Sequence, residues 1–196
     1  RDKGLRTSKM QSLPTSLAGK LCFEVGSELD RLREIPALHT ERLTLDALRE
    51  KDRAAYNALC LDEERNRLWG YDWRKDYDGR PVEEYFLAVA QEDFRLRRCV
   101  NFAVRLGEKC IGEAVLYNLD WRGGAELGCR IAPEYAGCGY GTEAFAAAAD
   151  WALYGLGLAR VVAKCFKENE ASYKMLSFSM TRTGEDEQYF YFEKTI

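Results

Sequence analysis

Three glycines at alternate positions, Gly137, Gly139 and Gly141, stand where a predicted strand, Ala125 to Ile131, meets a predicted helix. Glycine has no Cβ, so the main chain can adopt dihedral angles that other residues avoid, and a ligand can approach the backbone N–H groups closely. The first N–H groups of a helix lack intrahelical partners and lie at the positive end of its dipole. The sequence therefore predicts a loop that binds the phosphates of a nucleotide.

The loop by itself fits two kinds of nucleotide. The spacing Gly139-x-Gly141-x-x-Ala144 matches the loose dinucleotide pattern, and Glu168 lies further on, in the region of a ribose contact. In a dinucleotide fold, however, the loop belongs to the first strand–helix–strand unit. Here it comes after antiparallel strands, and too little chain remains beyond it for a doubly wound sheet. The element order therefore favours a different nucleotide.

Hydrophobic periodicity predicts the elements that position this loop. Strands are expected over residues 40–48, 99–106, 109–117, 125–131, 159–166, 180–183 and 188–194. Helices are expected over residues 50–61, 62–68, 81–94, 140–156 and 169–178. The fold class is α/β of the α+β mixed kind, with a mostly antiparallel sheet of about six to seven strands and helices on both faces. Residues 1–37 differ in pattern from the rest of the chain, with a possible strand in GKLCFEV and a short helix capped by Ser27, so we expect an N-terminal extension before a domain over 38–196.

Composition excludes several classes of function. The 196 residues carry 29 Lys and Arg against 32 Asp and Glu, a net charge of −3, which argues against a nucleic-acid partner. Seven cysteines without a CxxC pair, together with one histidine, give no metal or redox motif. No secretory or membrane-spanning segment is visible, so we expect a cytoplasmic protein with reduced thiols and no membrane partner.

From about Leu38 to Ile196 the chain resembles the GCN5-related N-acetyltransferases, in particular the ribosomal-protein-alanine acetyltransferase group. The likeness rests on ERLTL, AELGCRI, PEYAGCGYGTEA, ENEASYKML and an aromatic strand at the end. The acyl-CoA loop of that family reads Q/R-x-x-G-x-G/A, and Ala136, Gly139 and Gly141 occupy its positions. Ala136 replaces the Gln or Arg, and Cys138 stands where members often carry Lys or Arg. Both departures remove side-chain donors from the diphosphate site.

The resemblance implies a set of acetyl-CoA contacts. The end of the strand would pair with the pantetheine amides, and the loop would hold the diphosphate on backbone N–H groups. Asn169 matches an asparagine that fixes the pantetheine arm, although Asn before Glu170 and Ala171 is also a good helix N-cap. The implied contacts are Arg130, Ile131, Ala132, Ala136, Gly137, Cys138, Gly139, Tyr140, Gly141, Thr142 and Asn169, with no metal.

The implied reaction moves an acetyl group from acetyl-CoA to a primary amine by direct attack on the thioester. Such an amine has a pKa near ~10, so a carboxylate must take its proton, and Glu126 lies where family members often carry that base. Many relatives donate a proton to the departing thiolate from a tyrosine, but Leu176 occupies that position here. Ser172 and Tyr173 are the remaining candidates in the catalytic set.

The sequence does not determine the acceptor substrate or the oligomeric state. The acceptor is an amine-bearing small molecule or a protein N-terminus. The aromatic loop of Trp69, Tyr71 and Trp73 either contacts that acceptor or packs structurally. Because the tyrosine and the basic loop side chains are missing, a non-catalytic acyl-CoA-binding module or sensor is the alternative to an enzyme. The terminal YFYF strand and residues 1–37 are candidate interface elements of a homodimer.

Overall fold

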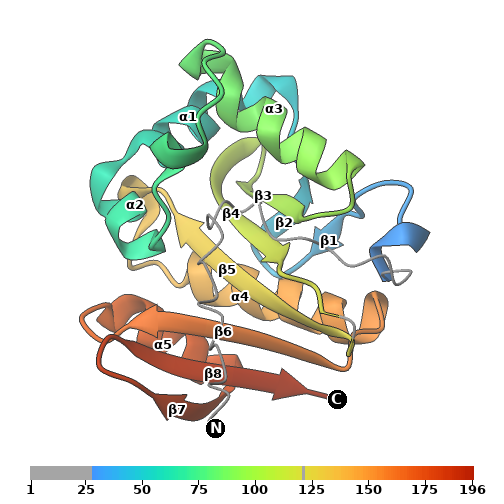
Figure 1. The fold of residues 1–196 in the computed structure, drawn as a ribbon, viewed down its shortest axis with the longest axis vertical. Coiled ribbons are helices and arrows are strands. Elements are labelled where there is room, and N and C mark those ends of the chain that lie inside the picture. The colour runs from blue at the N-terminus through green and yellow to red at the C-terminus, as the bar shows by residue number, and fades with distance from the viewer. Residues whose placement is uncertain (1–27, 121) are drawn as a thin grey trace, which may run out of the picture.

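A computed structural model describes residues 28–120 and 122–196 of the chain. One eight-stranded sheet, in the order β1-β2-β3-β4-β5-β6-β8-β7, forms its centre (Figure 1). Every neighbouring pair is antiparallel except β5 and β6, which are parallel. The strands are β1 (Leu38–His39), β2 (Leu43–Ala47), β3 (Val100–Leu106), β4 (Lys109–Tyr117), β5 (Gly124–Ile131), β6 (Arg160–Phe166), β7 (Thr181–Glu185) and β8 (Tyr189–Thr195).

Helices cover both faces of this sheet, with α4 and α5 behind it in Figure 1 and α1, α2 and α3 at its upper end. The α-helices are α1 (Arg53–Leu61), α2 (Glu63–Trp69), α3 (Val82–Arg95), α4 (Tyr140–Asp150) and α5 (Glu170–Ser179). Shorter 3₁₀ turns are η1 (Glu28–Arg31), η2 (Glu50–Asp52), η3 (Trp73–Asp76) and η4 (Pro133–Tyr135), and α4 continues into the π-helical turn η5 (Trp151–Gly155). Of the helices in the described part of the chain, none combines the length and apolar composition needed to cross a bilayer.

The larger hydrophobic core lies between the sheet and α4 and α5. Helix α4 supplies Ala144, Phe145, Ala148 and Ala149, whose spacing places them on one helical face, and α5 supplies Leu176. The small alanine side chains let α4 approach β5 closely, at the point where β5 feeds the glycine loop. The packing of α4 thereby fixes the position of its own N-terminus.

The opposite face of the sheet combines a smaller core with buried polar residues. Residues of α1 and α3, among them Tyr56 and Phe86, pack there against Ala103 of β3. Because side chains alternate along a strand, Asn101, Glu113 and Arg130 all point to this same face. We call it the polar face, since it carries most of the buried charged groups of the sheet.

The predicted mixed fold is confirmed, with eight strands where six to seven were expected. The additional strand is β1, a two-residue segment paired with β2, which is too short for a periodic signal. The helix expected after Ser27 is only the single turn η1, and its Leu29 is fully buried in the larger core. The strand expected in GKLCFEV, like Ser27, lies outside the described residues.

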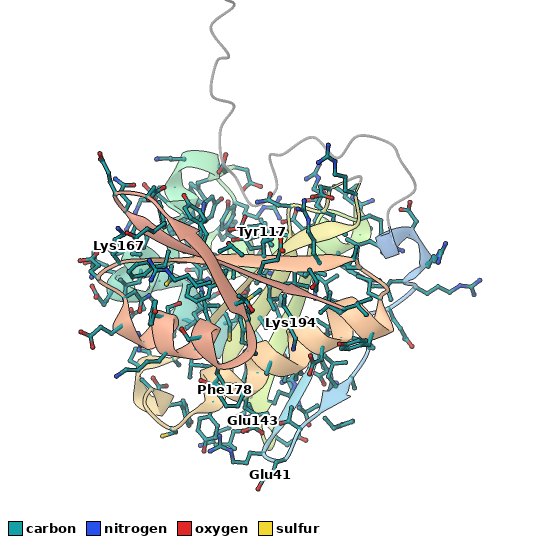
Figure 2. All side chains as sticks on the ribbon, turned by 90° about the horizontal axis from the view of Figure 1, so that it is seen from below. Glu41, Tyr117, Glu143, Lys167, Phe178 and Lys194 are labelled. Atoms are coloured by element: carbon teal, nitrogen blue, oxygen red, sulfur yellow. The ribbon has the colours of Figure 1, made fainter. Side chains whose placement is uncertain are left out.

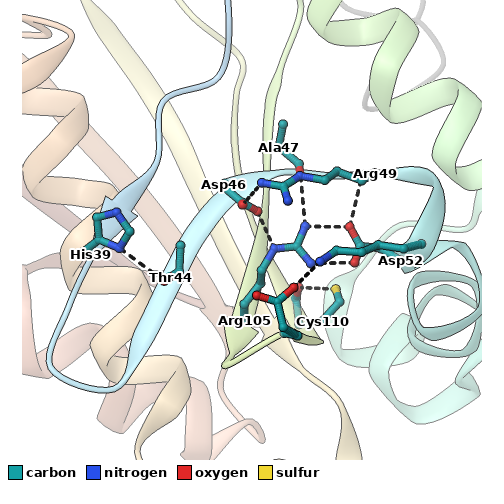
Figure 3. A network of polar contacts seen from close by, with 11 residues as sticks. His39, Thr44, Asp46, Ala47, Arg49, Asp52, Arg105 and Cys110 are labelled. Atoms are coloured by element: carbon teal, nitrogen blue, oxygen red, sulfur yellow. Dashed lines mark hydrogen bonds and ion pairs between the residues drawn. The ribbon is translucent and has the colours of Figure 1, made fainter.

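Strand β2 is more buried than its alternation predicted, because Asp46 on its polar face is buried and Thr44 on the same face is half-buried. Asp46 points to the polar face and is only 7% exposed, because the guanidinium of Arg105 on β3 covers it. The Nε atom of Arg105 lies 2.5 Å from Asp46 Oδ1, and its Nη1 atom lies 2.6 Å from Oδ1 of the buried Asp52 (Figure 3). Arg49 also pairs with Asp46. This charge network joins β2, β3 and η2.

The network gives Asp52 a pKa below its ordinary value. Burial alone raises the pKa of this carboxyl, but hydrogen bonds from the Arg105 guanidinium and the Arg49 amide outweigh burial and lower it. The carboxylate form is therefore stabilised in the folded protein. Its contribution to stability is complete above the unfolded-state pKa near ~3.9 and is lost as the pH falls through the lower folded-state value.

We expect Arg105→Met to lower the free energy of unfolding by about 3–5 kcal/mol at neutral pH, because two buried carboxylates lose their shared partner. Guanidinium chloride unfolding, followed by far-UV circular dichroism, measures the change. The difference from wild type shrinks as the pH falls, because the carboxylates of the variant, buried without Arg105, take up protons at a higher pH than those of the wild type. A difference that stays constant from pH 7 to pH 3.5 would contradict this role for Arg105.

Candidate functional site

The site begins where the two parallel strands part. Strands β5 and β6 pair only at Gly124 with Arg160, Ala125 with Val161, and Glu126 with Val162. Beyond Glu126, β5 continues its pairing with β4 as far as Ile131, while β6 continues its pairing with β8. The edge of β5 that faces β6 is therefore without a partner strand from Leu127 onward.

A cavity of about 590 Å³, which we call the slot, occupies the gap between the diverging strands. Residues of the larger core such as Phe145 and Leu176 line it from one face, and Trp69 and Glu126 line it from the polar face. The slot thus runs through the sheet. An unpaired strand edge can bind an extended ligand by main-chain hydrogen bonds, as an added strand would.

The glycine loop closes one end of the slot with unbonded backbone amides. Gly137 and Gly139 have φ angles of +78° and +80°, in the left-handed region where a Cβ is strained. Among the hydrogen bonds of the described residues, none has a donor in the backbone N–H groups from Gly137 to Thr142. These amides lie at the start of α4, where an anion is favoured. The loop therefore fits a diphosphate without the help of a basic side chain.

A clamp formed by Thr40, Arg42 and Glu143 holds this loop from outside. Oε1 of Glu143, in the first turn of α4, accepts hydrogen bonds from the Thr40 hydroxyl at 2.6 Å and the Arg42 amide at 2.9 Å. Figure 2 shows Glu143 beside the turn that carries Glu41. The Nε atom of Arg42 lies 2.7 Å from Oε2 of Glu143, and its Nη1 donates to the carbonyl of Cys138 at 2.9 Å. With this carbonyl held by Arg42, the loop backbone is tied to the start of β2.

Glu126 stands at the point where β5 and β6 separate. The Tyr117 hydroxyl donates to its Oε1 at 2.8 Å, and Asn118 Nδ2 donates to its Oε2 at 3.0 Å. Burial and the neighbouring Glu126 charge raise the pKa of Tyr117 well above its ordinary value, so the phenol stays protonated and remains a donor. Two donors therefore fix the carboxylate at the edge of the slot.

Helix α5 presents its N-terminus to the slot. Asn169 caps the helix, since its Oδ1 accepts from the Ser172 amide at 3.1 Å, and both residues line the slot. Tyr173 turns away, and its ring packs against Phe190 and Phe192 at centroid distances of 5.0 and 5.7 Å. The structure thus gives Tyr173 a packing role, while Ser172 stays beside the cavity.

Arg130 reaches across the polar face instead of into the glycine loop. Its Nε donates to Oε1 of the buried Glu113 at 2.7 Å, and its Nη1 donates to Asn66 Oδ1 at 3.0 Å. The guanidinium also lies over the Trp69 ring, 4.7 Å from its centroid. Trp69 covers Gly128 so closely that a Cβ there would lie 2.7 Å from the indole, so glycine is required under this wall of the slot.

The structure brings together most of the residues that sequence reasoning selected. The slot is lined by Glu126, Arg130, Ile131, Ala136, Gly137, Gly139, Tyr140, Gly141, Thr142, Asn169 and Ser172. Three selected residues do not line it: Ala132 packs with the smaller core, Cys138 is exposed on the loop, and Tyr173 is in the aromatic cluster.

Sequence reasoning missed the residues that act on this site from other elements. Tyr117 and Asn118 hold Glu126, yet nothing in their local pattern marks them. Lys164 and Tyr189 also line the slot, with the ammonium 5.1 Å from the ring centroid. Arg42 was visible only as part of the ERLTL motif, and its contact with the loop depends on the fold.

Solved structures of acetyltransferases share this architecture. RimJ of Mycobacterium smegmatis, solved with CoA-disulfide, superposes with a TM-score of 0.66 at 20% identity, covering 82% of this chain and 86% of its own. Spermidine N-acetyltransferase of Vibrio cholerae, solved with CoA and spermine, gives a TM-score of 0.67 at 18% identity, covering 80% of this chain and 96% of its own. These likenesses show that the chain shares its fold with N-acetyltransferases of known structure.

Sequence comparison identifies the family. The acetyltransferase (GNAT) domain matches residues 42–177, and the chain therefore belongs to the GNAT acetyltransferases, enzymes that take their acyl group from acetyl-CoA. The chain is also 27% identical over 161 residues to YoaA, an uncharacterized N-acetyltransferase of Bacillus subtilis (strain 168), covering 80% of this chain and 89% of YoaA. The expected family is confirmed.

We expect Arg42→Ala to raise the Kd for CoA by roughly ten-fold, because the glycine loop loses its tie to β2 and its amides are less well ordered. Isothermal titration calorimetry measures the affinity. Arg182→Ala, which removes an exposed arginine paired with Glu185 on the edge strand β7, is the matched control. Equal CoA affinity in the two variants would show that the clamp does not order the loop.

Proposed function

We propose that this GNAT protein transfers an acetyl group from acetyl-CoA to a primary amine, carried by a small molecule or a protein N-terminus, by direct attack on the thioester. The observation that supports this most directly is the end of β5–β6 pairing at Glu126. It places an unpaired strand edge, the free amides of the glycine loop and a fixed carboxylate around one slot. Binding of an acyl-CoA arm and deprotonation of an amine are thereby possible side by side.

The diphosphate would lie on the amides from Gly137 to Thr142, with Ala136 beside it. The pantetheine arm would run along the free edge of β5 toward Glu126, with Ile131 at its start and Asn169 across the slot. The Asn169 Oδ1 is engaged by the helix cap, so its Nδ2 is the group left to donate to a pantetheine carbonyl. This arrangement directs the thioester toward the polar face, where Glu126 stands.

Glu126 is our proposed general base. The amine nitrogen forms a bond to the thioester carbonyl carbon, the C–S bond breaks, and the amine proton passes to the carboxylate directly or through a water. Tyr117 and Asn118 orient the carboxylate for this transfer. The Ser172 hydroxyl, at the start of α5, is placed to bind the departing sulfur or a water that protonates it.

A non-catalytic acyl-CoA sensor is the second candidate, and one observation favours it. Leu176, in the position where many relatives carry a tyrosine, is 1% exposed in the larger core and offers no proton. Stabilisation by CoA without acetyl transfer to any amine would support the sensor. Detected transfer that depends on Glu126 would exclude it.

We expect acetyl-CoA, but not NADH, to raise the melting temperature of the protein by several degrees, because only acetyl-CoA fits both the loop and the slot. Differential scanning fluorimetry measures the shift. Stabilisation by NADH alone would instead favour a dinucleotide site and would refute the acetyl-CoA assignment of the loop.

We expect Glu126→Gln to lower kcat about 10²–10³-fold with little change in acetyl-CoA affinity, because the amide cannot accept the amine proton. Mass spectrometry of acetylated products across an amine panel measures transfer without interference from protein thiols. Glu108→Gln, which changes a carboxylate that is 90% exposed in the β3–β4 hairpin, is the control. Equal kcat values for the two variants would rule out Glu126 as the base.

A further inference from the structure

A second cavity of about 200 Å³, which we call the chamber, lies on the polar face beneath α3 and η3. Its volume is more than ten times the roughly 10–15 Å³ that one water requires. Aromatic rings form much of its wall, among them Trp73, Tyr85 and Phe86, whose centroids lie 5.1–5.7 Å apart. The chamber is therefore large enough for an organic group with an apolar body.

Two buried polar atoms in the wall of the chamber have no hydrogen-bond partner among the described residues. These are Oδ1 of Asn101, a residue 7% exposed, and the indole Nε1 of Trp73. The Asn101 amide is oriented by Glu113, because its Nδ2 lies 3.5 Å from a carboxylate oxygen that can only accept. Its Oδ1 is therefore left as an acceptor, and Trp73 adds a donor. A ligand that completes both bonds needs an N–H group and an oxygen.

The charges of the chamber favour a cation. Its wall contains five carboxylates and three arginines. Each arginine already faces one carboxylate: Arg130 faces Glu113, Arg80 faces Asp78, and Arg98 faces Asp93. The carboxylate of Asp76 accepts the Tyr71 hydroxyl at 3.0 Å and has no cationic partner among the described residues. A positively charged group would complete this arrangement.

Of the three carboxylates in the chamber wall that face an arginine, Asp93 has the longest contact with its partner. It is 4% exposed, and its contact with Arg98 spans 3.6 Å, longer than a hydrogen bond. Burial raises the pKa of its carboxyl to about 6, although Arg98 acts to lower it. A ligand ammonium beside Asp93 would offset the cost of burying this charge.

The chamber also borders the slot. Val115 lines the chamber, and its partner across the β4–β5 pairing is Gly128, which lines the slot. Paired strands lie about 4.7–4.9 Å apart, and both Arg130 and Asn66 lie next to this boundary. A molecule whose amine reaches Glu126 could therefore extend its far end into the chamber.

We propose that the chamber binds the non-reacting end of the acceptor, and that this end carries a second protonated nitrogen with a hydrogen-bond-accepting oxygen nearby. This inference rests on the proposed acetyl transfer for the identity of the ligand as an acceptor. The second nitrogen donates to Asn101 and faces Asp93 and Asp76, and the oxygen accepts from Trp73. The acceptor class is thus a diamine that bears an amide or hydroxyl group.

Three matched probes test the two parts of this proposal. Lysinamide has a distal amine that can react and, at its other end, a second amine beside a carboxamide oxygen. In 6-aminohexanamide that second amine is missing, and in cadaverine the carboxamide is missing. Calorimetry on the CoA-saturated protein measures binding, and mass spectrometry measures acetylation. We expect lysinamide to bind about ten-fold or more tightly than 6-aminohexanamide, and several-fold more tightly than cadaverine.

Chamber variants locate the binding. Asn101→Leu removes the acceptor oxygen in a side chain of similar size, and Asp93→Asn removes the buried charge. Each should abolish the preference for lysinamide over 6-aminohexanamide, while Trp73→Phe should abolish the preference over cadaverine. Asp150→Asn, an exposed aspartate paired with Lys194, is the control and should keep both preferences. Circular dichroism confirms that each variant is folded.

The outcomes separate this proposal from the proposed function. Preferences in binding that are lost in the chamber variants support the chamber even if no acetylation is detected, in which case the transfer reaction fails alone. Acetylation of all three probes without preference overturns the chamber proposal and leaves the transferase intact. Preferences that persist in Asn101→Leu and Asp93→Asn also overturn it, because the groups recognised would then lie elsewhere.

Discussion

The parting of β5 and β6 after Glu126 is the constraint on which the site depends. As long as two strands pair, their backbone groups are satisfied and nothing can enter between them. Once they diverge, one edge of β5 becomes available to a ligand, and residues from both faces of the sheet border the same space. The glycine loop, Glu126 and the start of α5 would otherwise be separate features of the molecule.

The gap between β5 and β6 must stay open, and residues of the polar face help to keep it open. Arg130 joins β5 to Glu113 on β4 and to Asn66 in α2, and it supports the Trp69 ring over Gly128. Burial of such charges is costly, and a buried ion pair is a poor source of net stability compared with apolar packing. Its value here is positional, because the guanidinium fixes α2 relative to the strand that lines the slot. The Arg105 network plays a comparable part for η2 on the same face, closer to the β1 edge of the sheet.

Much of this architecture could be predicted from sequence because its signals are local. Alternation in residues 40–48 and helical spacing after Tyr140 define their elements, and three glycines at alternate positions predict a loop with left-handed residues. The contacts of Glu126 with Tyr117 and Asn118 could not be predicted, since they depend on the register between β4 and β5. The burial of Asp46 could not be predicted either. Alternation shows on which face of the strand a residue lies, but it does not show that an arginine from the neighbouring strand covers that residue.

The hydrogen bonds of Glu143 to Thr40 and Arg42 connect segments about a hundred positions apart in the chain. The glycine loop therefore owes its shape to a turn made near the far edge of the sheet, as well as to its own residues. A fragment that began after β2 would contain every residue of the loop but would lack the anchor that orders it. The ability to bind a diphosphate is therefore a property of the whole folded domain, because it depends on contacts between segments that are far apart in the sequence.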